Sequence, residues 1–157
     1  MFEITTDYFA AQNPLEQALE QVPGIKRVYL SDELADVKED RQTTPSIHLM
    51  YYGDNLPESK NAGHLMQLTQ TWIVVLVVRK QDTNAGEHLT NIIRAMAGKV
   101  LNGTGPWLRV NTPAKPQFTK GHAYYPLAFT CDLKPNQLVR QIALGIPVVL
   151  WPTADGS

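Results

Sequence analysis

The segment at residues 66–80 constrains the fold of this chain more than any other feature. Polar and apolar side chains alternate at its start, and every residue from Trp72 to Val78 is apolar. This run is far shorter than the roughly 20 residues that cross a bilayer as a helix, so we expect no membrane span. We interpret the segment as one long strand. The change in pattern predicts one water-facing side at its start and two covered sides at its end.

Two segments carry apolar residues at helical spacing. Residues 13–22 predict a first helix, with Asn13 as the N-cap, Pro14 in the first turn and Gly24 after the last turn. Its apolar face comprises Leu15, Ala18, Leu19 and Val22. Residues 84–101 predict a second helix, which we expect to end at Asn102 and Gly103. Its apolar stripe comprises Leu89, Ile92, Ile93, Met96 and Val100, and Asn84 with Glu87 resembles a capping box.

Several shorter segments have the composition of strands. Residues 25–30, 47–52 and 107–111 are each predicted to be extended, and Gly53 begins a predicted polar loop that runs to Gly63. Residues 31–40 are rich in acids and remain ambiguous between a helical turn and a loop. A second Pro-containing loop is expected over residues 113–121.

The clearest alternation in the chain follows this second loop. One predicted face of the closing strand carries Tyr125, Leu127, Phe129, Cys131 and Leu133, and the other carries Tyr124, Pro126, Ala128, Thr130 and Asp132. Because proline cannot donate to a strand ladder, Pro126 predicts that this strand lies at a sheet edge.

Together these elements predict an α+β fold. We expect a mixed, mainly antiparallel sheet of four to five strands with two helices packed on one face. The predicted domain covers residues 1–135, and residues 136–157 form an extension with a frayed end. That extension is unusual because it carries a run of apolar side chains, interrupted by Gly145 and Pro147. Those we expect to contact a partner are Ile142, Leu144, Ile146, Val148, Val149, Leu150 and Trp151.

The charge and cysteine content narrow the classes of function. The net charge is -1, with 14 basic and 15 acidic residues scattered along 157 positions, which argues against a dedicated nucleic-acid binder. One cysteine, Cys131, permits no intrachain disulfide and fits a reducing compartment. The first residues lack the basic start and apolar core of a signal peptide, so we expect the protein to stay in the cytoplasm of its producing cell.

No residue pattern predicts catalysis or metal binding. The four histidines, His48, His64, His88 and His122, lack metal-ligand spacing, and we interpret them as core or surface residues. Cys131 lies on the predicted inward face of its strand, where a buried hydrophobic residue is expected rather than a nucleophile.

Two further segments partly resemble ligand-binding motifs but lack the residues that define those motifs. Residues 103–107 are glycine-rich but lack the lysine of a phosphate loop, so we predict a turn. The acidic side chains of residues 32–40 lack the ligand spacing of a calcium loop and predict a solvated face. We therefore expect no catalytic residue, no cofactor and no metal site.

Four segments of the sequence together resemble those of a known protein family. They are PSIHLMYYG, QLTQTWIVVLVVR, AGEHLTNIIRAMAGKVLNG and GHAYYPLAFTCDL, which together cover about residues 45–133. Through these four segments, the chain resembles the tail terminator proteins of long-tailed bacteriophages. The resemblance implies a small α+β structural protein without catalytic residues. It would form a hexameric ring on the head-proximal end of the tail tube, where it stops tube growth and presents a surface to the neck.

The resemblance also implies the partners. They are further copies of the chain, the tail tube protein, a neck or head-completion protein, and a sheath protein if the tail contracts. DNA would pass through the ring without specific binding, and the protein would reside in the virion. A head-to-tail joining or neck-completion protein of similar fold is the alternative, and a small-molecule binding module or hydrolase is a distant third. The apolar content of residues 142–151, outside the predicted helix-sheet core, independently favours assembly.

Overall fold

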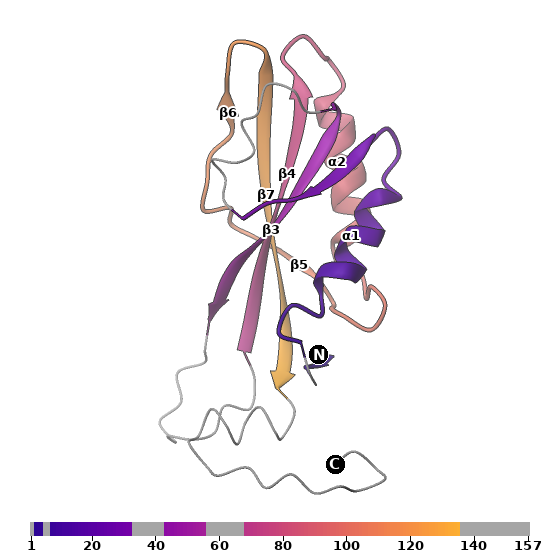
Figure 1. Ribbon diagram of the computed structural model, residues 1–157, viewed down its shortest axis with the longest axis vertical. Helices are drawn as coiled ribbons and strands as arrows, with labels where there is room; N and C mark the ends of the chain where they lie inside the picture. Colours follow the sequence, from indigo (N-terminus) through magenta and orange to yellow (C-terminus); the bar gives the residue numbers. More distant parts are fainter. Residues whose placement is uncertain (1, 5–6, 33–42, 56–67, 136–157) are drawn as a thin grey trace, which may run out of the picture.

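The computed structural model describes residues 2–4, 7–32, 43–55 and 68–135. The described elements, in chain order, are β1 (Phe2–Ile4), α1 (Gln12–Glu20), β2 (Arg27–Leu30), β3 (Ser46–Asn55), β4 (Leu68–Arg79), α2 (Ala85–Met96), β5 (Leu108–Val110), β6 (Gln117–Phe118) and β7 (His122–Pro135). All described strands belong to one sheet of order β1-β7-β4-β3-β2, and β5 and β6 pair with β7 (Figure 1). No described helix is long and apolar enough to cross a membrane.

The sheet is mixed and mainly antiparallel, and both helices pack on one of its faces (Figure 1). Strands β3, β4 and β7 form its antiparallel centre, while β2 runs parallel to β3 and β1 runs parallel to β7. The predicted α+β class is confirmed. The described residues form seven strands rather than four to five, because β1, β5 and β6 each contribute only two or three residues to the outer edge of β7.

The long strand behaves as its sequence predicts. At the start of β4, Leu68 is buried while its neighbour Thr69 is half-buried, and this alternation continues to Thr71. From Trp72 to Val78 every side chain is buried. The prediction of one open face followed by two covered faces is confirmed.

Two apolar clusters account for this double burial. The helix-side core joins α1 and α2 to one face of the sheet; its largest members are Leu15, Leu19, Ile47, Leu49, Trp72, Leu76, Ile92, Met96, Trp107 and Phe129. The second core lies on the other face and comprises Met50, Ile73, Val75, Val77, Tyr124 and Ala128. Successive residues of β4 alternate between the two cores, as the pleat of a strand requires.

The first helix begins earlier than predicted. Its N-cap is Ala11, so Asn13 lies inside the first turn and makes no side-chain cap. Pro14 is tolerated there because the first helical amides have no partner within the helix. The predicted capping role of Asn13 is therefore wrong, although the helix itself is confirmed.

The second helix ends earlier than predicted. It stops at Met96, and Ala97 is already extended with φ -63° and ψ 123°. The next residues pair with the chain entering β5, where the Gly98 amide donates to the Trp107 carbonyl over 2.6 Å. This pairing overrides the helical spacing of Val100, which is 64% exposed. The tight turn predicted nearby is confirmed, with Asn102 and Gly103 at φ 47° and 84°.

The predicted edge position of the closing strand is wrong. Strand β7 pairs with β4 along one side, and β6, β5 and β1 pair along its other side. Pro126 lies between the stretch that pairs with β6 and the stretch that pairs with β5. Proline has no backbone N–H to donate. Pro126 therefore lies at a position where neither β5 nor β6 requires that hydrogen bond. The alternation of the two faces of β7 is confirmed.

Candidate functional site

His48 is a buried core histidine near the start of β3. Its Nδ1 lies 2.7 Å from the Ser31 hydroxyl, and its ring stacks on Tyr29 at 4.8 Å between centroids and 14° between planes. Burial lowers the pKa of His48 to about 4, because the charged imidazolium loses its hydration. The side chain is neutral near pH 7 and too weakly basic to act as a general base there.

The other histidines do not assemble into a site. His88 is buried on α2 against the backbone of Gly24, and neither of its ring nitrogens has a hydrogen-bond partner among the described residues. His122 is half-buried at the start of β7, and His64 lies outside the described residues. No group of three or more His, Cys, Asp or Glu side chains that could hold a metal ion occurs in the part of the chain that the structure describes.

Cys131 lies in the helix-side core, as predicted. Its side chain is buried, and burial followed by the neighbouring Asp132 raises the pKa of the thiol to about 12. Because the thiolate is the nucleophilic form, this environment suppresses reactivity.

A β-bulge in β3 creates a polar cluster that the sequence did not reveal. Tyr51 pairs with Trp72 and Gly53 pairs with Thr71, so Tyr52 is the extra residue. Beyond the bulge Asp54 falls on the same face as Tyr51, opposite Gln70. The predicted start of the polar loop at Gly53 is wrong, because the strand continues to Asn55.

Asp54 accepts hydrogen bonds from two tyrosines on this face. One comes from Tyr8, and the other comes from Tyr51 over 3.3 Å. Burial is the largest cause that raises the pKa of each phenol, and the carboxylate adds to it. A raised phenol pKa opposes the use of either tyrosine as a base or nucleophile.

The same cluster fastens the chain before α1 to the sheet. The Gln70 amide donates to the Tyr8 carbonyl over 2.8 Å, and the Trp72 indole donates to Gln70 Oε1 over 3.1 Å. Phe9 packs edge-on against Tyr51 with 5.0 Å between ring centroids. These contacts satisfy the buried polar atoms of Gln70 and Trp72, so the cluster is structural.

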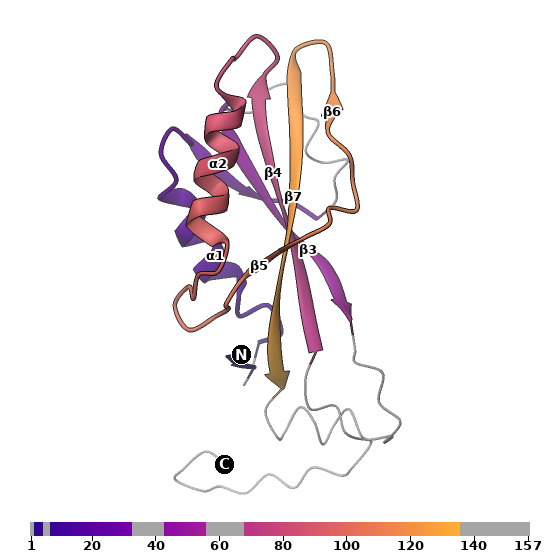
Figure 2. The same ribbon diagram turned by 180° about the vertical axis from the view of Figure 1, so that it is seen from behind.

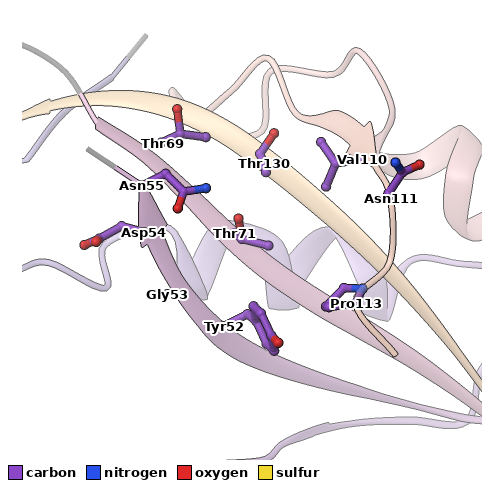
Figure 3. A pocket seen from close by; sticks show the side chains of 10 residues that line it. All are labelled: Tyr52, Gly53, Asp54, Asn55, Thr69, Thr71, Val110, Asn111, Pro113 and Thr130. Carbon is purple, nitrogen blue, oxygen red and sulfur yellow. The ribbon is translucent and has the colours of Figure 1, made fainter. Parts of the chain in front are cut away.

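A groove of about 550 Å³ lies beneath the chain that follows β5. Figure 3 shows lining side chains from β3, β4 and β7, including Tyr52, Thr69, Thr71 and Thr130. Among the described residues of the lining, Asp54 is the one acidic residue, and Figure 3 shows its carboxylate pointing away from the other labelled side chains. Hydroxyl and amide groups without a convergent charged pair do not form a general acid–base site.

Most of the chain matches a known protein family. The family model described as phage tail terminator protein matches residues 4–137. The chain belongs to the phage tail terminator family. It therefore has a structural role in a phage tail and is a virion component, in a family of structural proteins rather than a class of enzymes. A search of curated proteins gives no match.

The predicted contact residues of this tail terminator lie outside the described residues. They are Ile142, Leu144, Ile146, Val148, Val149, Leu150 and Trp151. The family match ends at residue 137, before this segment begins.

The structure instead reveals a second pocket that the sequence did not predict. It has a volume of about 300 Å³ and lies on the helix side near β2. Its walls include Phe9 and Leu30, which are 45% and 50% exposed. Their isolated positions before α1 and at the end of β2 gave no periodic signal, so only the fold could bring them together.

Proposed function

We propose that this tail terminator forms a ring, with a hexamer as the expected size, at the head-proximal end of the tail tube. The ring stops polymerisation of the tube and offers the joining surface for the neck. Membership of the phage tail terminator family, over residues 4–137, is the observation that carries this proposal.

The shape of the sheet supports assembly into a ring. Its two edges differ, since β2 closes one side and the short strands β1, β5 and β6 line the other. A head-to-tail contact between two different surfaces closes into a ring when the rotation between subunits allows it.

The partners in this proposal are further copies of the chain, the tail tube protein, a neck or head-completion protein and, in a contractile tail, the sheath protein. DNA passes through the ring without being read. The net charge of -1 supports a lumen that does not grip phosphates. Weak binding of DNA by the isolated ring is expected; nanomolar binding that falls steeply with salt would contradict this part of the proposal.

We also propose that residues 136–157 form an extension of the domain at residues 1–135. Its apolar residues 142–151 would pack on a neighbouring subunit or on a tube or neck protein. A chain truncated after Pro135 should lose the oligomer or fail to join tails. A truncated chain that does both normally would refute the role of this segment.

Electron microscopy of particles made without the protein tests the function directly. Overlong tails are expected, because nothing would stop growth of the tube. Tails of normal length that remain unattached to heads would instead identify a head-to-tail joining or neck-completion protein. Purified wild-type protein added to the mutant lysate is the control, and it should restore tails of normal length.

A further inference from the structure

The pocket near β2 is a hollow with both apolar and polar walls at one edge of the sheet, which we call the edge pocket. It opens between the chain before α1 and the end of β2, and its lining includes Phe9, Leu30, Asp32, Leu49, Tyr51 and Trp72. Leu30 pairs in register with Leu49, a member of the helix-side core, so both side chains face the helix side. A cavity of about 150 Å³ holds a benzene molecule, so about 300 Å³ accommodates a phenyl ring.

An exposed phenyl ring lies at the opposite edge of the sheet. Phe118 of β6 is 57% exposed and pairs in register with Ala123, which belongs to the helix-side core. Its ring packs edge-on against Tyr125, with 5.9 Å between centroids and 86° between planes. This contact holds the ring in place, which lowers the entropy lost when it binds a partner. Phe118 therefore stands on the same face of the sheet as the edge pocket.

The two surfaces also differ in charge. Asp32 is exposed at the rim of the edge pocket. Lys120 is exposed two residues beyond Phe118, and residues 108–122 contain three basic residues and no acidic one. The Asp32 carboxylate and the basic edge attract each other, and two basic edges repel each other.

These observations select a second copy of the chain as the occupant. In Figure 1, β6 lies to the left of β7, and α1 lies to the right of the long strands. One chain cannot place its own Phe118 in its own pocket, because β7, β4 and β3 separate β6 from β2. Subunits in a cyclic ring are related by a rotation that repeats the same contact. A protruding side chain at one edge and a pocket at the opposite edge of the same face can therefore meet between each pair of neighbouring subunits.

We propose that Phe118 of each subunit inserts into the edge pocket of the next subunit, with Lys120 beside Asp32. This inference rests on the proposed ring and names the two surfaces that build it.

Cross-linking between introduced thiols tests the contact. The variant Leu30→Cys with Phe118→Cys, treated with a short bis-maleimide, should yield a covalent ladder of subunits up to the size of the ring. Either single substitution should yield no ladder, because a head-to-tail contact brings two different residues together. The native Cys131 is buried and should not interfere.

The outcomes separate this inference from the proposed function. A wild-type ring without a ladder in the double variant would overturn the contact and leave the ring standing. A ladder from Leu30→Cys with Trp151→Cys, and none with Phe118→Cys, would assign the pocket to the C-terminal segment and also overturn the inference. A wild-type protein that forms no ring would remove both proposals.

Charged substitutions provide an independent test by native mass spectrometry. Phe118→Asp should convert the ring to monomers, whereas the control Leu108→Asp should leave it intact. Leu108 is comparably exposed at 54% and lies at the same edge, but its neighbour Val110 packs against the second core, so it faces the other side. Asp32→Lys and Lys120→Asp should each weaken the ring, and their combination should restore it. A ring broken by Leu108→Asp but not by Phe118→Asp would refute the contact.

Discussion

Apolar side chains at the centre of the sheet and at its edges have different environments. At the centre, Ile73 to Val78 are buried between the helix-side core and the second core. At the edges, Leu30 and Phe118 leave half or more of their surface exposed, at 50% and 57%. Burial stabilises the subunit, whereas exposed apolar surface becomes favourable only when a partner covers it. Central substitutions should therefore change stability, and edge substitutions should change assembly.

The largest effect is expected for Trp72→Ala. Trp72 is buried in the helix-side core, and its indole donates to the buried Gln70 amide oxygen. Removing the ring leaves a cavity and an unsatisfied polar atom, so the free energy of unfolding should fall by about 3–5 kcal/mol. Urea unfolding of monomeric protein measures this. Phe118→Ala is the edge control and should change the same quantity by less than about 0.5 kcal/mol. Equal losses for both variants would contradict the distinction between centre and edge.

Acid should destabilise the subunit through His48. The pKa of this side chain is lowered from 6.5 to about 4 in the folded protein. Between these values the unfolded chain binds a proton that the folded chain does not, so stability is full above pH 6.5 and falls as pH drops toward 4. The loss should reach roughly 2–3 kcal/mol, and it should largely disappear in His48→Gln. Thermal unfolding across pH 4–7 measures both proteins, and identical pH profiles would exclude His48 as the cause.

A smaller effect is expected for Gly24→Ala. Gly24 has φ +83°, and an added Cβ would lie 2.6 Å from Cε1 of the buried His88. Strain and steric overlap should lower the free energy of unfolding by roughly 1–3 kcal/mol. Gly86→Ala is the matched control, because it lies in α2 with nothing within 4 Å of an added Cβ. That control should be neutral or up to about 1 kcal/mol more stable, reflecting the helix propensity of alanine. Calorimetry measures the stability of both variants. A Gly86→Ala variant less stable than Gly24→Ala would contradict this packing.

The smallest expected effect concerns Cys131. Because burial raises the pKa of its thiol to about 12, the folded protein should react negligibly with a thiol reagent at pH 8. Full reaction should require denaturant. Mass spectrometry after timed labelling measures the rate, and rapid modification of the folded protein would show that this part of the core opens easily.

The central elements could be predicted because their signals are long and periodic. An apolar run marks β4 and alternation marks β7; these strands span 12 and 14 residues, and both form as predicted. The spacing of Leu15 and Leu19, and that of Ile92 and Met96, predicts the two helices that build the helix-side core.

The edges could not be predicted, since their residues act through tertiary pairing. Strand β6 has two residues and exists because it pairs with β7. The bulge at Tyr52 extends β3 past a glycine that signals a turn, and the end of α2 is fixed by the backbone bonds of Trp107. The edge pocket joins residues from four separate parts of the chain, so no local pattern marks it.

Native mass spectrometry of the purified protein tests the central claim most directly. We predict a closed assembly of about six times the 17.5 kDa chain, which Phe118→Asp reduces to monomers without unfolding them. A wild-type protein that remains monomeric at every concentration would contradict it.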